Sequence, residues 1–109
     1  MLTRVLIVAT LITVWASYGA MAARLSALEQ QGKAVLTRLC AACHAVGEAD
    51  RSRHLGAPAF RSIQDRYDID DLVERLREGF TAPHPDMPTF TFTPEHARAV
   101  RAYLKAIQR

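Results

Sequence analysis

The feature that most restricts the fold of this chain is the segment Cys40-Ala41-Ala42-Cys43-His44, which contains both of its cysteines. The segment follows a stretch with helical periodicity in a chain of 109 residues. A chain of this length buries little apolar surface when it folds, and it often needs a covalent or metal staple. What the two thiols bind therefore decides which core the chain can build.

Apolar residues recur at spacings of three and four in nearly every segment, which predicts helices rather than strands. Gly32 lies inside the first such stripe, where glycine costs about 1 kcal/mol relative to alanine. We therefore expect another helix to pack closely against this position. The stripe consists of Leu28, Gly32, Val35, Leu36 and Leu39, and a shorter one after Pro58 consists of Phe60, Ile63 and Tyr67.

Two later helices carry start and stop signals. Asp68 is the predicted N-cap of one and Gly79 its stop, while Thr93 is the predicted N-cap of the last helix and Pro94 its first residue. The sequence thus predicts an all-α domain of about four to five helices, with irregular stretches between them. The two apolar stripes are Ile69, Leu72, Val73 and Leu76, then Val100, Tyr103, Leu104 and Ile107.

Residues 1–22 have the pattern of an export signal. Arg4 supplies a positive charge, residues 5–15 are apolar, and Ala20-Met21-Ala22 is a small-x-small cleavage pattern. We expect cleavage after this pattern, which leaves a folded domain of residues 23–109. An uncleaved membrane anchor is the alternative, because the apolar run approaches the length of a membrane span. Either version places the folded domain in the periplasm, in contact with a membrane only if the segment is retained.

The spacing C-x-x-C-H is typical of c-type haem attachment. Two thiols three positions apart on a helical turn can reach the two vinyl groups of one porphyrin. We expect Cys40 and Cys43 to form the thioethers of one haem c, and His44 to bind its iron. The ring would then supply much of the apolar core, and its expected lining is Leu39, Phe60, Leu72, Leu76, Phe80 and Phe90.

Other uses of two cysteines have less support. A thioredoxin-like dithiol follows a strand in a βαβ unit, and no strand is predicted here. A structural zinc site needs a second pair of ligands, which no further cysteine supplies. A plain disulfide remains conceivable in an exported protein.

Met87 lies in residues 83–90, where three prolines exclude a helix interior or a central strand. A haem that carries electrons without binding small molecules needs a sixth ligand. A thioether is soft and neutral, so it favours ferrous iron and raises the reduction potential. We therefore expect Met87 to be that ligand; His84 is its chief rival, and His54 and His96 are weaker ones.

Together these residues resemble a class I cytochrome c in its short bacterial form. The resemblance covers residues 28–107 and rests on the attachment motif, on Gly56-Ala57-Pro58, on Met87-Pro88-Thr89-Phe90 and on Tyr103-Leu104 in the closing helix. It implies a small class I cytochrome c-like domain wrapped around one covalently bound haem.

The resemblance also implies roles for individual residues. The carbonyl of Pro58 is expected to accept the Nδ1–H of His44 and orient its ring, and Gly32 of the first helix is expected to cross the last helix at Tyr103. Some family members place a tryptophan against a haem propionate, but the single tryptophan here, Trp15, lies in the export segment. The arginines that remain as possible propionate partners are Arg51, Arg53 and Arg61.

The expected function is one-electron transfer by a periplasmic monohaem cytochrome with His/Met ligation that cycles between Fe(III) and Fe(II). Its partners would be donor and acceptor redox proteins, with no small-molecule substrate and no enzymatic reaction. A dedicated cytochrome subunit of an exported dehydrogenase is the alternative, followed by a thiol oxidoreductase or a ligand-sensing haem protein. The net charge of +3 without a basic run between aromatics argues against nucleic-acid binding.

Overall fold

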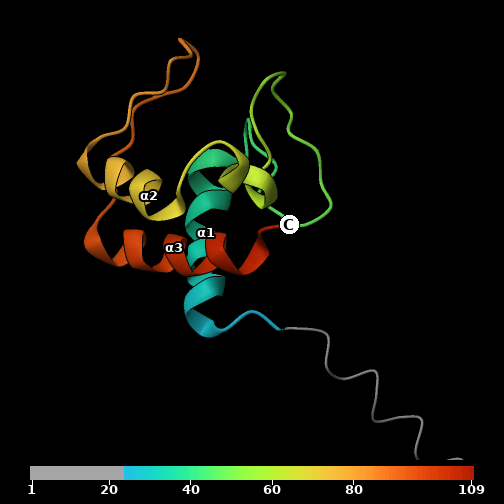
Figure 1. Ribbon diagram of the computed structural model, residues 1–109, viewed down its shortest axis with the longest axis vertical. Helices are drawn as coiled ribbons and strands as arrows, with labels where there is room; N and C mark the ends of the chain where they lie inside the picture. The colour runs from blue at the N-terminus through green and yellow to red at the C-terminus, as the bar shows by residue number, and fades with distance from the viewer. Residues whose placement is uncertain (1–23) are drawn as a thin grey trace, which may run out of the picture.

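The computed structural model describes residues 24–109, so the predicted export segment and its cleavage site lie outside the described residues. It contains the α-helices α1 (Ala27–Cys40), α2 (Ile69–Glu78) and α3 (Pro94–Ile107), and the 3-10 helix η2 (Phe60–Asp65) (Figure 1). Within residues 24–109 the only β pairing is an isolated bridge between Phe80 and Phe90. The all-α prediction is confirmed.

Side-chain caps fix where the helices begin. Asp68 caps α2 and Thr93 caps α3, as predicted, and each side chain accepts a backbone N–H of the first turn. Ser26 caps α1 in a reciprocal capping box with Glu29, which the sequence analysis did not foresee. Gly79 ends α2 in the left-handed region at φ 103°, where glycine adds no steric cost.

Helix α1 crosses α3 at Gly32 (Figure 1). A Cβ atom at this position would overlap the carbonyl of Ala99 and would lie 2.9 Å from the Cβ of Tyr103. Tyr103 is fully buried, and its hydroxyl donates a hydrogen bond of 2.6 Å to the carbonyl oxygen of Val46. The close approach that the glycine predicted is therefore the α1–α3 crossing.

The apolar core lies between the three α-helices and η2. Helix α2 packs on α3, and Asp70 at the rim of this contact pairs with Arg101 at 2.9 Å and Lys105 at 2.8 Å. No helix in residues 24–109 is both long and apolar enough to span a membrane. The predicted stripe residues that are buried in the core are Gly32, Val35, Leu36, Phe60, Ile63, Ile69, Leu72, Val73, Leu76, Val100, Tyr103, Leu104 and Ile107.

Two long irregular loops, residues 45–57 and 81–92, extend to the same side of the helices (Figure 1). They meet where Nε2 of His54 lies 3.2 Å from Oδ2 of Asp86. The second loop returns to the core at Phe92, whose backbone N–H donates to the carbonyl of Leu76 at 2.9 Å. Both loops thus contribute, together with α1 and α2, to the lining of one cavity.

Candidate cofactor site

A cavity of about 430 Å³ lies between α1, η2, α2 and the two long loops. Its walls are mainly aliphatic and aromatic side chains, which suits an apolar ligand. All six residues that the sequence predicted as haem lining are among its lining residues: Leu39, Phe60, Leu72, Leu76, Phe80 and Phe90. The same cavity is lined by Cys40, Cys43, His44, Pro58 and Met87.

The two cysteines lie at the end of α1 and in the turn that follows it. Cys40 is the last residue of the helix, and the backbone N–H groups of Cys43 and His44 both donate to its carbonyl oxygen, at 3.1 and 2.9 Å. The chain therefore continues for one more turn and keeps both cysteines among the residues that line the cavity. Two thiols on one turn beside an apolar cavity are suited to covalent attachment of a flat ring.

The environment of Cys40 does not suit a redox-active dithiol. Burial, and to a smaller extent the neighbouring Cys43, raise the pKa of the Cys40 thiol to about 11. Thiol oxidoreductases need a reactive thiolate, which their sites produce by lowering the thiol pKa. Residues 24–109 also contain no βαβ unit. Both observations argue against a thiol oxidoreductase.

The ring of His44 is held from two sides. Its Nδ1 lies 2.8 Å from the carbonyl oxygen of Pro58, and because that oxygen can only accept, Nδ1 carries the proton. The ring also stacks on Phe60, with centroids 4.7 Å apart and planes at 18°. The donated proton leaves the lone pair on Nε2, the arrangement in which metal-binding histidines are usually held.

Met87 is half-buried and lines the cavity on the opposite loop from Pro58. Its backbone N–H donates to the carbonyl oxygen of His84 at 3.3 Å, which makes a tight turn. The rival ligands His54 and His84 line the same cavity, whereas His96 is not among its lining residues. The structure therefore brings the predicted sixth ligand and two of its three rivals to one cavity.

Sequence reasoning missed one cationic lining residue. Among the described residues that line the cavity, Arg66, just after η2, is the single arginine or lysine. The three arginines considered from the sequence do not line it, and one of them, Arg61, donates instead to the carbonyl of Asp50 at 2.7 Å. The sequence did not distinguish Arg66, because an arginine between the apolar positions Ile63 and Tyr67 is also expected on the exposed face of a helix.

These side chains fit haem c. The apolar cavity accepts a porphyrin, the two thiols are placed for its vinyl groups, and the imidazole presents an unprotonated nitrogen for its iron. Arg66 adds one positive charge on the wall, opposite in sign to a propionate. The fold and the site thus define a small haem protein of the c type.

Comparison with known proteins agrees with this class. The family model described as "Cytochrome C oxidase, cbb3-type, subunit III" matches residues 27–104. Cytochrome c-552 of Bradyrhizobium diazoefficiens (strain JCM 10833 / BCRC 13528 / IAM 13628 / NBRC 14792 / USDA 110) is 30% identical over 77 residues, which are 71% of this chain and 72% of that protein. No solved structure matches the chain.

The chain therefore belongs to the cytochrome c family, as a monohaem c-type cytochrome. Members of this family carry covalently bound haem c, and Cys40 and Cys43 are the residues positioned to attach it. The protein is an electron-transfer haem protein.

Proposed function

We propose that the protein is an exported, freely diffusing one-electron carrier with His44 and Met87 as the axial ligands of its haem iron. The observation that carries this proposal is the shared cavity, which His44 and Met87 both line together with the two cysteines. Haem c, when bound, supplies the Fe(III)/Fe(II) couple. The remaining chemistry belongs to the side chains around it.

His44 and Met87 have different tasks at the iron. The hydrogen bond from Nδ1 of His44 to Pro58 fixes the ring and increases the basicity of Nε2. The Met87 thioether is a weak, neutral donor that favours Fe(II) and raises the potential. A sixth position filled by a side chain also excludes small ligands, which favours electron transfer over ligand sensing or peroxidase chemistry.

Arg66 is proposed to pair with a haem propionate. It is exposed and lines the cavity, so its positive charge can pair with a carboxylate at the edge of the cavity. This pairing would replace the tryptophan contact of some family members.

The proposed location is the periplasm, with residues 1–22 as the export signal. The signal pattern at the N-terminus supports it, as does haem attachment through an intact C-x-x-C-H motif. Donor and acceptor would be other redox proteins.

A subunit of an oxidoreductase complex is the second candidate. The printed description of the matching family model names an oxidase subunit, which favours it. The similarity to a protein named simply cytochrome c-552 supports the free carrier.

Optical spectra of the purified protein, oxidised and reduced, with and without carbon monoxide, test the ligation. The wild type should be low-spin and should not bind carbon monoxide. Met87→Ala should keep its haem, because the thioethers and His44 remain, but should become partly high-spin and bind carbon monoxide when reduced.

His84→Ala is the matched control and should leave the spin state and carbon monoxide binding as in the wild type. If His84→Ala opens the iron to carbon monoxide while Met87→Ala does not, His84 is the sixth ligand and the expected high potential is lost with it. Gel filtration of the native protein from its source membrane and soluble fractions separates the free carrier from the complex subunit.

A further inference from the structure

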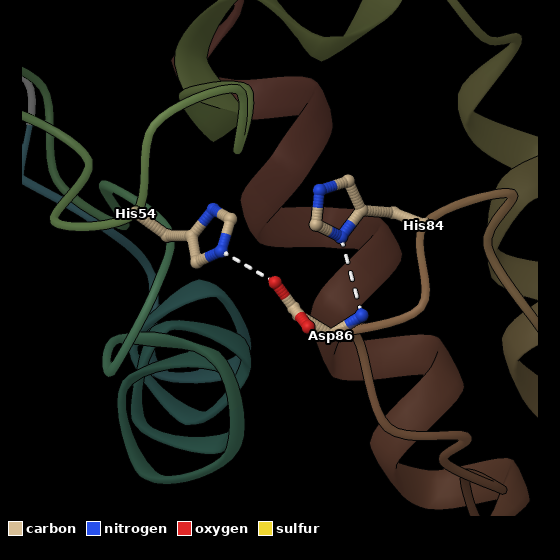
Figure 2. Close-up of side chains that lie close together, drawn as sticks. All are labelled: His54, His84 and Asp86. Carbon is tan, nitrogen blue, oxygen red and sulfur yellow. Dashed lines mark hydrogen bonds and ion pairs between the residues drawn. The ribbon is translucent and has the colours of Figure 1, made fainter.

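His54, His84 and Asp86 form a compact group where the two long loops meet (Figure 2). Each residue offers one donor atom, and these atoms all lie within 4.8 Å of one another. His54 comes from the loop after α1, while His84 and Asp86 come from the loop before α3. The group is half-exposed to exposed, so an ion from solvent can reach it.

The hydrogen bonds of His54 leave one ring nitrogen, Nε2, facing the carboxylate of Asp86. Its Nδ1 lies 2.7 Å from the carbonyl oxygen of Leu55, so Nδ1 carries the proton. In the neutral ring Nε2 is then an acceptor, and it lies 3.2 Å from Oδ2 of Asp86, which is also an acceptor. Two acceptors at this distance are stabilised only by a positive charge between them, which is either a proton or a metal ion.

His84 brings a second nitrogen to the same point. Its Nδ1 accepts the backbone N–H of Asp86 at 3.3 Å, a long hydrogen bond that engages the single lone pair of Nδ1 only weakly. The two rings stand perpendicular, at 90°, with centroids 5.1 Å apart. Figure 2 shows them on either side of Asp86. A metal ion at this point would replace the long hydrogen bond at Nδ1 of His84 with a stronger metal–nitrogen bond.

The donor set selects the class of ion. Two imidazole nitrogens and one carboxylate oxygen suit zinc and its neighbours in the transition series, whereas calcium and magnesium prefer oxygen donors alone. Three protein ligands with water in the fourth position form a common zinc arrangement. We propose that His54, His84 and Asp86 bind one divalent transition-metal ion of the zinc class.

The position of this metal site links two parts of the haem site. His54 is four residues before Pro58, and Asp86 directly precedes Met87. A bound ion therefore cross-links the loop that orients His44 to the loop that carries Met87. The proposal rests on Met87 as the sixth ligand, because His84 cannot bind the haem iron and a second ion at once; none of its three ligands is needed for haem attachment.

Isothermal titration of Zn²⁺ into the haem-loaded protein tests the proposal. The haem-loaded form is required because its cysteine sulfurs are thioethers, which removes them as competing zinc ligands. One saturable site is expected in the wild type. Asp86→Asn, His54→Gln and His84→Gln should each weaken the affinity by about tenfold or more, since even the loss of a residue that only supports a metal ligand costs about 10- to 100-fold.

His96→Gln is the matched control, because His96 is the remaining histidine outside both sites. It should bind Zn²⁺ as the wild type does. The absorption spectrum and thermal unfolding of every variant are recorded first, and Asp86→Asn, which keeps the size of the side chain, decides the test if a histidine variant unfolds. Absence of saturable binding in the wild type, equal affinity in Asp86→Asn, or loss of binding in His96→Gln overturns the proposal.

Discussion

Tyr103 joins three parts of the molecule through one side chain. Its ring lies fully buried at the α1–α3 crossing, against Gly32, and its hydroxyl donates to the carbonyl oxygen of Val46 at 2.6 Å. Val46 is two residues after His44, so this hydrogen bond anchors the chain directly behind the expected iron ligand. A residue predicted only as a helix contact thus also supports the cofactor site.

The ionisation of Tyr103 should make stability depend on pH in alkali. Burial, and to a smaller extent the carboxylates of Glu48 and Asp50, raise the pKa of Tyr103 from its ordinary 10.0 to about 12. The folded state then holds a proton that the unfolded state has lost, so this contribution is complete below pH 10 and declines as the pH rises towards 12. Denaturant unfolding of the wild type at intervals across this range measures the decline.

Tyr103→Phe is the comparison for this prediction. It should cost about 0.5–1.5 kcal/mol at neutral pH, the usual worth of one hydrogen bond. It should also lose less stability than the wild type as the pH rises through the same interval. If both proteins lose stability equally, the alkaline dependence arises elsewhere.

Among the elements, the crossing of α1 and α3 depends on the absence of a side chain at Gly32. We expect Gly32→Val to destabilise the haem-loaded protein by about 1–3 kcal/mol, because a branched side chain must push the helices apart. Thermal or denaturant unfolding measures the loss. Ala34→Val on the exposed face of α1 is the control, and it should cost only the difference in helix propensity, below about 0.7 kcal/mol.

The helices could be predicted where their signals are local. Asp68, Gly79 and Thr93 fix helix ends through their own side chains or backbone freedom, and the sequence analysis placed all three correctly. Ser26 was missed, because its capping box precedes the apolar stripe by two residues. The segment after Pro58 is a 3-10 helix of six residues. Over so short a segment the 3-10 period of 3.0 residues and the α-helical period of 3.6 residues predict nearly the same apolar stripe, so the sequence did not distinguish the two kinds of helix.

The site was predictable to the extent that it lies in short motifs. The attachment motif and the apolar lining follow from residue type and spacing, and the cavity contains all of them. The meeting of His54 with Asp86, 32 residues apart, depends on the paths of two irregular loops. No periodicity governs such paths, so single-sequence reasoning did not give this contact, and it did not distinguish Arg66, which lines the cavity although it is exposed.

For the molecule as a whole, the cavity is the centre of the fold. Side chains from α1, η2, α2, α3 and both loops surround it, so the elements share one apolar space. We expect Cys40→Ala combined with Cys43→Ala to leave mostly unfolded protein, because a chain this short cannot replace the core that the attached ring completes. Circular dichroism and thermal unfolding measure the remaining structure.

Arg38→Gln is the control for the cysteine variant. It changes an exposed side chain in the last turn of α1, outside the lining of the cavity, and keeps both thiols, so haem content and unfolding should match the wild type. A double cysteine variant that unfolds cooperatively at the temperature of the wild type would show that the protein chain alone builds a sufficient core.

The α1–α3 crossing also ties the first described helix to the last one. Helix α1, which ends at Cys40, packs mainly on α3, so the surface that holds the thiol-bearing turn comes from the far end of the described sequence. Because a chain without its ring should stay mostly unfolded, that turn remains open to haem attachment until the thioethers form. Attachment of the ring therefore comes before the closing of the crossing, and not after it.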